Sequence, residues 1–144
     1  MDNGKGLQLL SAEILKTIEE ASGHDILAAY ARQLGGKLEL TQKVLQFLMP
    51  FAHKGDYERF LSDATVFMEF FGNIVVGWLW LGMAIRAQAA LVSGDTSSTT
   101  DFYDSKIHAM KFYFKYELPK TTALAEVLLN EEVLTVAADN KMFT

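Results

Sequence analysis

The stretch that decides the fold runs from Phe70 to Ile85 and reads FFGNIVVGWLWLGMAI. It contains no charged side chain, and Glu69 and Arg86 stand directly at its two ends. Its 16 residues would make a helix about 24 Å long, which is shorter than the roughly 30 Å hydrocarbon core of a bilayer. We therefore interpret the stretch as the central helix of an all-α bundle, buried on most sides, rather than as a membrane span.

Three glycines in this stretch, Gly72, Gly77 and Gly82, are expected to let neighbouring backbones approach closely. An alternative stays open, in which Trp78 or Trp80 helps to form an exposed apolar patch for a protein partner or a membrane surface. If Trp78 is buried, its replacement by alanine should destabilise the bundle by about 3–5 kcal/mol. A loss below about 1 kcal/mol would place Trp78 on the surface instead.

Before this stretch, the spacing of apolar and turn-forming residues predicts two further helices. The first covers about residues 7–22 and stops at a Ser-Gly pair. The second continues from about residue 24 to the neighbourhood of residues 51–54. Gly35 and Gly36 lie in its middle, and each costs about 1 kcal/mol relative to alanine, so we expect a kink, a break or a close helix crossing there.

The helix that contains the apolar stretch is the longest and should extend from about residue 57 to 92. Gly55 is expected to terminate the preceding helix in a left-handed conformation, and Asp56 to cap the next one. A polar loop at residues 93–100 then leads to a fourth helix that starts near Asp101.

Pro119 predicts a kink in or after the fourth helix, because proline cannot donate a hydrogen bond to the carbonyl of Lys115. Beyond Asn130 no long apolar period continues. The sequence therefore predicts a four-helix up-down bundle over residues 1–130, followed by a C-terminal tail over residues 131–144.

Length, charge and cysteine content narrow the classes of function. The 144 residues correspond to one domain with a sizeable core, and half of them are hydrophobic. The absence of cysteine excludes disulfides, thiolate metal sites and thiol nucleophiles. The 13 Lys+Arg against 18 Asp+Glu give a net charge of −5, which argues against nucleic-acid binding.

Motifs for metal, nucleotide or nucleophile chemistry are missing from the sequence. It has no Glu-x-x-His pair, no P-loop, no Gly-x-Gly-x-x-Gly and no Gly-x-Ser-x-Gly. We expect the three histidines, His24, His53 and His108, to be structural or exposed. No catalytic, cofactor-binding or metal-binding residue is predicted.

Polar residues of the fourth helix are expected to form a solvated face. These residues are Asp104, His108, Lys111 and Lys115, and an ion pair between the first two would be worth about 0.2–0.5 kcal/mol. A sharper interpretation is that the lysines of this region dock on an acidic surface of another domain. The lysines in question are Lys106, Lys111, Lys115 and Lys120.

The order of short motifs along the sequence resembles a known family. In the predicted third helix they are Phe70-Phe71-Gly72, Gly77-Trp78-Leu79 and the small residues Ala84, Ala87, Ala89 and Ala90. In the fourth they are Phe102-Tyr103 with Lys106, Phe112-Tyr113, and Leu118-Pro119 with the continuation over residues 121–125. The opening residues, 3–10, are similar to the start of the same domain in that family. Over about residues 3–130 the chain thus resembles the extra helical C-terminal domain of the long acyl-CoA dehydrogenases.

What the resemblance implies is a parent flavoenzyme that removes two hydrogens from the α and β carbons of an acyl-CoA thioester. A glutamate base takes the α-proton and FAD takes the β-hydride in that chemistry. The flavin-binding domain, the catalytic core and the glutamate base of the family belong upstream of the matched region. Glu58 and Glu69 share only their residue type with that base, and no matched motif supports either of them in its role.

The resulting expectation is a non-catalytic structural or interface module, inactive alone, whose partners are the catalytic domains of the parent chain. It carries no cofactor itself, FAD belongs to the parent, and a homodimer is possible. We expect a cytoplasmic location, no nucleic acid and no membrane contact. Two alternatives stay open: a free-standing helical interaction bundle for a protein partner or a membrane surface, and a ligand-binding helical enzyme in its own right.

Overall fold

The protein is all-α in the part that its structure describes. The computed structural model describes residues 5–53, 58, 61 and 63–130. Over these residues it contains five named α-helices and no strand, so the all-α prediction is confirmed. The helices are α1 (Lys5–Ser22), α2 (Ala28–His53), α4 (Ala64–Ser93), α5 (Thr100–Tyr116) and α6 (Lys120–Leu128).

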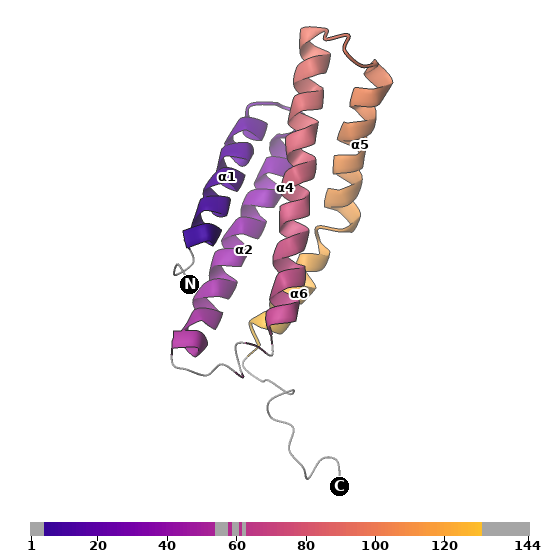
Figure 1. Ribbon diagram of the computed structural model, residues 1–144. Helices are drawn as coiled ribbons and strands as arrows, with labels where there is room; N and C mark the ends of the chain where they lie inside the picture. Colours follow the sequence, from indigo (N-terminus) through magenta and orange to yellow (C-terminus); the bar gives the residue numbers. More distant parts are fainter. Residues whose placement is uncertain (1–4, 54–57, 59–60, 62, 131–144) are drawn as a thin grey trace.

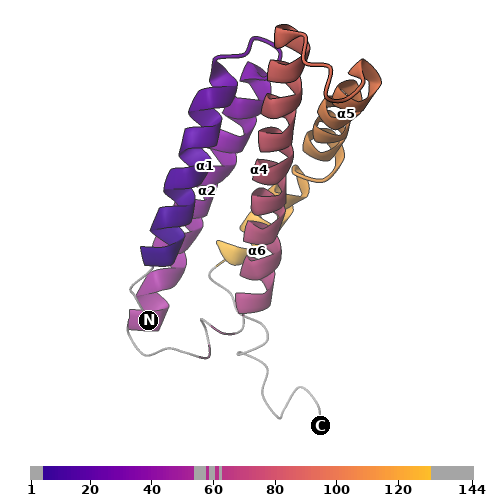
Figure 2. The same ribbon diagram turned by 45° about the horizontal axis from the view of Figure 1, so that its top comes forward.

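Helix α4 is the centre of the bundle and packs against each of the other four (Figure 1). Helices α1 and α2 lie side by side on one flank of α4, and α5 lies along its C-terminal half on the other. Helix α6 packs against α4 and α2 near the N-terminal end of α4. Figure 2 shows the same arrangement from a second angle, with long helices that follow one another in the sequence running in opposite directions.

The core follows from heptad-like spacing on two helices. On α2 and the turn before it, the buried positions recur at intervals of three or four residues, and on α4 they do the same. The stripe on α2 consists of Leu27, Ala31, Leu34, Leu38, Thr41, Val44 and Leu48. The stripe on α4 consists of Phe70, Ile74, Gly77, Leu81 and Ala84. Helix α5 closes the core with Ile107, Met110 and Phe114.

Thr99 and Gly94 set the limits of the α4–α5 connection. Gly94 has a φ of 73°, and its N–H caps α4 by donating to the carbonyl of Ala90. Thr99 caps α5 by accepting a 3.1 Å hydrogen bond from the amide of Phe102. The fourth predicted helix therefore starts at Thr100, one residue before the expected Asp101.

The kink expected at Pro119 separates α5 from α6. The amides of Glu117 and Leu118 both donate to the carbonyl of Tyr113, which tightens the end of α5. Leu118 is fully buried in this break. The hydroxyl of Thr121, also buried, donates to the carbonyl of Leu118 at 2.6 Å and so satisfies both groups.

Several expectations about glycines differ from the structure. Helix α2 runs without a break through Gly35 and Gly36, and a Cβ added at either would meet nothing within 4 Å, so the expected close crossing is wrong. Only one of the three glycines of the apolar stretch, Gly77, faces crowded neighbours. A Cβ at Gly72 would meet nothing within 4 Å. The expected cap pair Gly55 and Asp56 lies outside the described residues.

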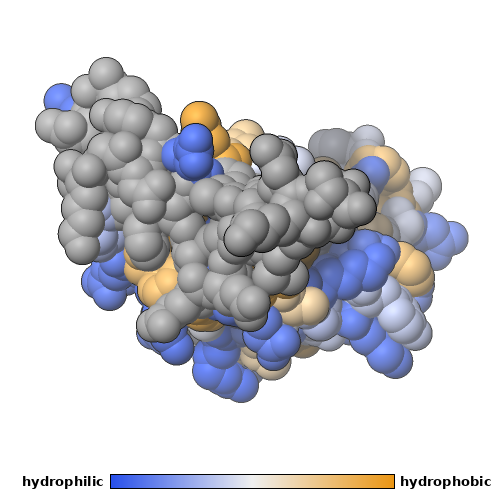
Figure 3. All heavy atoms as spheres, turned by 90° about the horizontal axis from the view of Figure 1, so that it is seen from below, coloured by the Kyte–Doolittle hydropathy of each residue, from blue (hydrophilic) through white to orange (hydrophobic). Residues whose placement is uncertain are grey.

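The starts of two helices were predicted too early. Helix α2 begins at Ala28 rather than near His24, because the chain first turns through a hydrogen bond from the amide of Leu27 to the carbonyl of His24. Helix α4 begins at Ala64, after a turn at Asp63; Glu58 and Leu61, which the prediction placed in the same helix, are helical but lie before that turn. Seen from below, the described residues at this end of the bundle show hydrophobic patches interleaved with hydrophilic side chains (Figure 3).

Candidate functional site

A hydrogen bond between α4 and α5 holds the middle of the bundle together. The hydroxyl of Tyr113 donates to the backbone carbonyl of Asn73 at 2.6 Å and lies 3.4 Å from the Asn73 side-chain oxygen. Burial raises the pKa of the Tyr113 hydroxyl, and the nearby Glu117 carboxylate raises it further. The hydroxyl of this half-buried tyrosine is engaged in a contact between α4 and α5, which is a structural role.

Other inter-helix hydrogen bonds have the same structural character. The indole of Trp78 donates to the hydroxyl of Thr17 on α1 at 2.7 Å, so Trp78 is partly buried and anchored. The side-chain amide of Gln33 donates to the carbonyl of Phe114 at 2.9 Å. The surface-patch interpretation of Trp78 loses support, because its polar edge is already engaged within the bundle.

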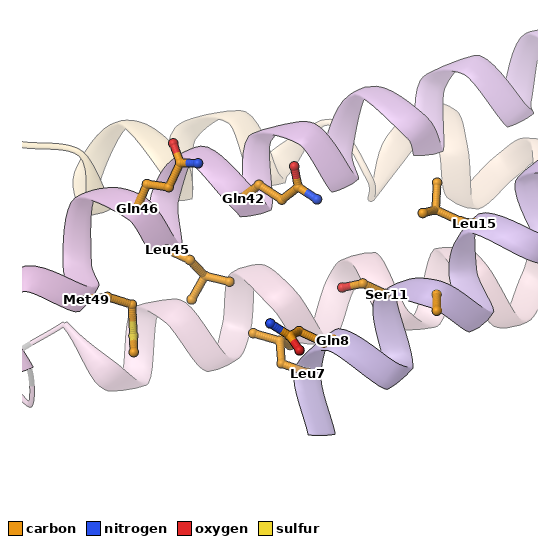
Figure 4. A pocket seen from close by; sticks show the side chains of 9 residues that line it. Leu7, Gln8, Ser11, Leu15, Gln42, Leu45, Gln46 and Met49 are labelled. Atoms are coloured by element: carbon orange, nitrogen blue, oxygen red, sulfur yellow. The ribbon is translucent and has the colours of Figure 1, made fainter. Parts of the chain in front are cut away.

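A groove lies between α1 and α2 (Figure 4). Its volume is about 470 Å³. Leu45 and Met49 extend from α2 into the space between the two helices, and Leu7 and Gln8 lie opposite on the first turns of α1. Ser11, Ala12, Leu15, Gln42 and Gln46 complete the lining.

The chemistry available in this groove is limited by its residue types. None of its nine lining residues is titratable, so the groove offers neither a general acid nor a general base. Leucine and methionine side chains provide apolar contact, and three glutamines and one serine provide neutral hydrogen-bonding groups at the rim. The groove can therefore accept an apolar group but cannot perform proton-transfer chemistry on it.

A second hollow, of about 380 Å³, lies between α4 and α5 near the Gly94 turn. Its charged lining residues are Arg86, Lys106 and Asp95. The side chain of Lys106 lies over the ring of Phe102, 5.1 Å from the ring centre. The pKa of the Asp95 carboxyl is lowered by hydrogen bonds from Ser97, so the carboxylate stays ionised and offsets part of the positive charge.

The residues singled out by type in the sequence do not come together. Glu58 and Glu69 are both exposed and line neither hollow. Asp104 and His108 are exposed, as the solvated-face prediction had them, but they form no ion pair in the described structure. Lys120 pairs with Glu117 at 3.0 Å. Among the described residues no three His, Asp or Glu side chains gather as metal ligands would.

One face of α4 carries exposed apolar side chains. Met68, Gly72, Val76, Leu79 and Met83 recur at spacings of four, four, three and four residues, so they share one face. Met68 is 70% exposed, Val76 40% and Leu79 51%. We call these five residues the α4 stripe. Within the stretch from Phe70 to Ile85 only Gly72, Val76 and Leu79 are exposed, so the stretch is buried or partly buried on most sides, in agreement with the prediction, and open along this one face.

Helix α4 is also long and apolar enough to cross a membrane by length and composition. Its 30 residues exceed the 16 of the uncharged stretch, and 33% of its most apolar 18-residue window is buried. The core helix of a soluble bundle passes the same test, so this finding is weak evidence for a span.

Sequence reasoning missed both the α1–α2 groove and the α4 stripe. The groove combines the i, i+4 pairs Leu7–Ser11 and Leu45–Met49 from two helices, and only the packing of α1 on α2 brings them together. The sequence does contain the pattern of the stripe, because the apolar residues Met68, Val76 and Leu79 recur at helical spacing on the side of Gly72. It was hidden because every position of the stretch is uncharged, so no polar face marked the outside.

Comparisons with known proteins cover nearly the whole bundle. The profile of a family described as "Acetyl-CoA dehydrogenase C-terminal like" matches residues 10–139. The chain is also similar to the broad-specificity linear acyl-CoA dehydrogenase FadE5 of Mycobacterium tuberculosis, with 28% identity over 135 residues. The matched region includes 88% of this chain but 22% of FadE5, so the chain spans about a fifth of the length of this curated relative.

Proposed function

We propose, from the premise that this chain belongs to the acetyl-CoA dehydrogenase C-terminal-like family, that it is the C-terminal helical module of an FAD-dependent acyl-CoA dehydrogenase. The parent enzyme would carry out the α,β-dehydrogenation of acyl-CoA thioesters. The observation that carries the proposal is the family match, which extends from α1 through α6 and so covers the bundle as one unit.

The module itself would be non-catalytic. The flavin of the parent carries a diphosphate, which proteins hold with cationic side chains or backbone amides. No cationic side chain lines the α1–α2 groove, so that groove has nothing to hold a diphosphate. The second hollow has Arg86 and Lys106 beside Asp95, but at about 380 Å³ it is small for a dinucleotide. We therefore assign the flavin chemistry and its glutamate base to the rest of the polypeptide.

The role left to the module is structural. It would pack against the catalytic domains of the parent chain and could also influence the formation of a homodimer. Residues 1–130 would form the bundle and residues 131–144 its tail, with a cytoplasmic location and no nucleic-acid or membrane partner. A second candidate is a free-standing interaction bundle, and the exposed α4 stripe is the observation that favours it.

The experiment that tests the proposal compares the complete polypeptide encoded by the gene with this chain alone. The complete polypeptide should purify with a flavin absorbance that an acyl-CoA thioester bleaches. The 144-residue chain, titrated with FAD and with acyl-CoA, should bind neither. A gene without a flavin-binding region upstream of Met1, or tight FAD binding by this chain, would overturn the proposal.

A further inference from the structure

The α4 stripe is an apolar surface whose middle, at Gly72, Val76 and Leu79, is exposed in the described structure. At its ends, Met68 borders a hollow against α2, and the partly buried Met83 borders the hollow against α5. From Met68 to Met83 it extends along 15 helical rises, or about 22 Å. Its three most exposed residues, Met68, Val76 and Leu79, are large and apolar. Contiguous apolar surface of this kind marks an interaction site.

Gly72 provides an independent observation at the centre of the stripe. A glycine inside an exposed stretch of helix is destabilising relative to alanine, yet a Cβ here would meet nothing within 4 Å. Contacts within the bundle therefore do not require glycine at this position. Gly77 is the contrast, because its Cβ would lie 3.3 Å from the Leu118 side chain. The open surface at Gly72 fits the close approach of another helix from outside the bundle.

The ends of the stripe indicate the charge of the partner. Glu69 and Arg86 are both exposed, and neither forms an ion pair within the described part of the chain. Between them α4 carries no cation. A helix that lies on a membrane surface instead carries lysine and arginine along its polar flank. The pattern fits a protein surface that is apolar in its middle and has opposite charges at its two ends.

The length of FadE5 outside the matched region indicates what could cover the stripe. The matched region makes up 22% of FadE5, so nearly four-fifths of that relative lies outside it. A catalytic body joined to the bundle by the same chain is present at a high effective concentration, which neither a second copy nor a lipid surface shares. We propose that the α4 stripe is the face on which the bundle docks against the dehydrogenase body of its own polypeptide, with a helix of that body crossing at Gly72. This inference rests on the proposed function.

Thiol labelling tests the proposal, because this chain contains no cysteine of its own. The variant Leu79→Cys places one thiol in the centre of the stripe, and Val92→Cys places a control thiol on the same helix outside it. Labelling by a maleimide is followed by mass spectrometry of the α4 peptide, in the complete polypeptide and in the 144-residue chain. At position 79 the complete polypeptide should react roughly tenfold more slowly, since an interface must open before the thiol reacts. At position 92 the two should react alike.

A second pair of variants tests the crossing at Gly72. In the complete polypeptide, adding Gly72→Ala to Leu79→Cys should speed labelling several-fold, because a methyl group intrudes between the two surfaces. Gly36→Ala is the matched control, because Gly36 is likewise helical, exposed and without neighbours within 4 Å. It should leave the labelling rate unchanged.

Equal labelling of position 79 in both proteins would overturn the proposal, even if the flavin of the complete polypeptide is active. Protection that appears in the 144-residue chain and grows with its concentration would assign the stripe to a second copy instead. Protection that appears only with vesicles of phosphatidylcholine and phosphatidylglycerol would assign it to a membrane. A gene that encodes no flavoenzyme body is a separate result, since it refutes the proposed function first.

Discussion

At the scale of single residues, a few side-chain hydrogen bonds fix how the helices face one another. The Tyr113–Asn73 and Trp78–Thr17 bonds tie α4 to α5 and to α1. Each bond links groups that are partly shielded from water, where a lost partner costs more than at the surface. Tyr113 and Trp78 are also aromatic, so each contributes apolar contact in addition to its hydrogen bond. Suitable substitutions separate the contribution of the hydrogen bond from that of the ring.

Removal of the Tyr113 hydroxyl should weaken the bundle modestly. Tyr113→Phe keeps the ring but loses the 2.6 Å hydrogen bond to the Asn73 carbonyl, so we expect a loss of about 0.5–1.5 kcal/mol in the free energy of unfolding. Urea denaturation measures it. Tyr116→Phe is the control, because Tyr116 is exposed and its hydroxyl has no hydrogen bond in the described structure; its effect should stay within about 0.5 kcal/mol.

The same hydroxyl predicts a pH dependence. Burial and Glu117 raise the pKa of Tyr113, so the folded state holds this proton more tightly than the unfolded state does. Its contribution to stability is complete below the ordinary tyrosine pKa of about 10 and is lost as pH rises through the folded value. The stability advantage over Tyr113→Phe should therefore stay constant up to about pH 9 and shrink as the pH rises above about 10. A constant difference would contradict the assignment.

Trp78 should matter through both its ring and its indole N–H. We expect Trp78→Phe to cost about 0.5–1.5 kcal/mol through the lost bond to Thr17, and Trp78→Ala to cost about 3 kcal/mol because the ring packs against the core. Thr17→Val tests the bond from the other side, and a double-mutant cycle with Trp78→Phe should show coupling. A loss below about 1 kcal/mol for Trp78→Ala would restore the surface interpretation.

At the scale of the elements, helix ends that carry a local capping or helix-breaking residue were predicted more accurately than the starts of α2 and α4. Capping chemistry is local, so Thr99, Gly94 and Pro119 mark the limits of α4, α5 and α6 in the sequence itself. The orientation of α4 is set by all its neighbours together, and an uncharged sequence gives no periodic contrast from which to read it.

Replacement of Gly72 and of Gly94 by alanine should change the stability of the protein in opposite directions. Gly72→Ala should stabilise the 144-residue chain by about 0.5–1 kcal/mol, because the Cβ meets open space and alanine favours helix. Gly94→Ala should destabilise it by about 1 kcal/mol, because the φ of 73° is costly for a residue with a Cβ. Thermal and urea unfolding measure both, and a stabilising Gly94→Ala would contradict the cap geometry.

At the scale of the whole molecule, the described helices should unfold together. Helix α4 packs against each of the other four, so none of them can lose its core contacts without exposing α4. Both tryptophans, Trp78 and Trp80, lie on α4 and report its environment. The urea midpoint from tryptophan fluorescence should coincide with the midpoint from far-UV circular dichroism. Separate midpoints would mean that part of the bundle is an independent unit.

Function was less accessible to the sequence than fold, for a physical reason. The family could be suspected from the order of motifs such as Gly77-Trp78 and Leu118-Pro119, because these mark packing positions that the fold imposes. A docking face has no such local signature. Leu79 has the residue type of a core position, and only the three-dimensional arrangement shows that about half of its side chain is exposed.

The break between α5 and α6 has a consequence for insertion tolerance. Leu118 is buried beside Gly77 and fixes the packing of the α5–α6 break on α4. The Gly94–Thr99 connection lies at the other end of α5 and is not part of this contact. Extra residues in that exposed connection would lengthen a surface loop, whose entropic cost grows only slowly with length. The connection is therefore the natural place to splice in an epitope or a fluorescent reporter, because the alignment of the helices is set elsewhere.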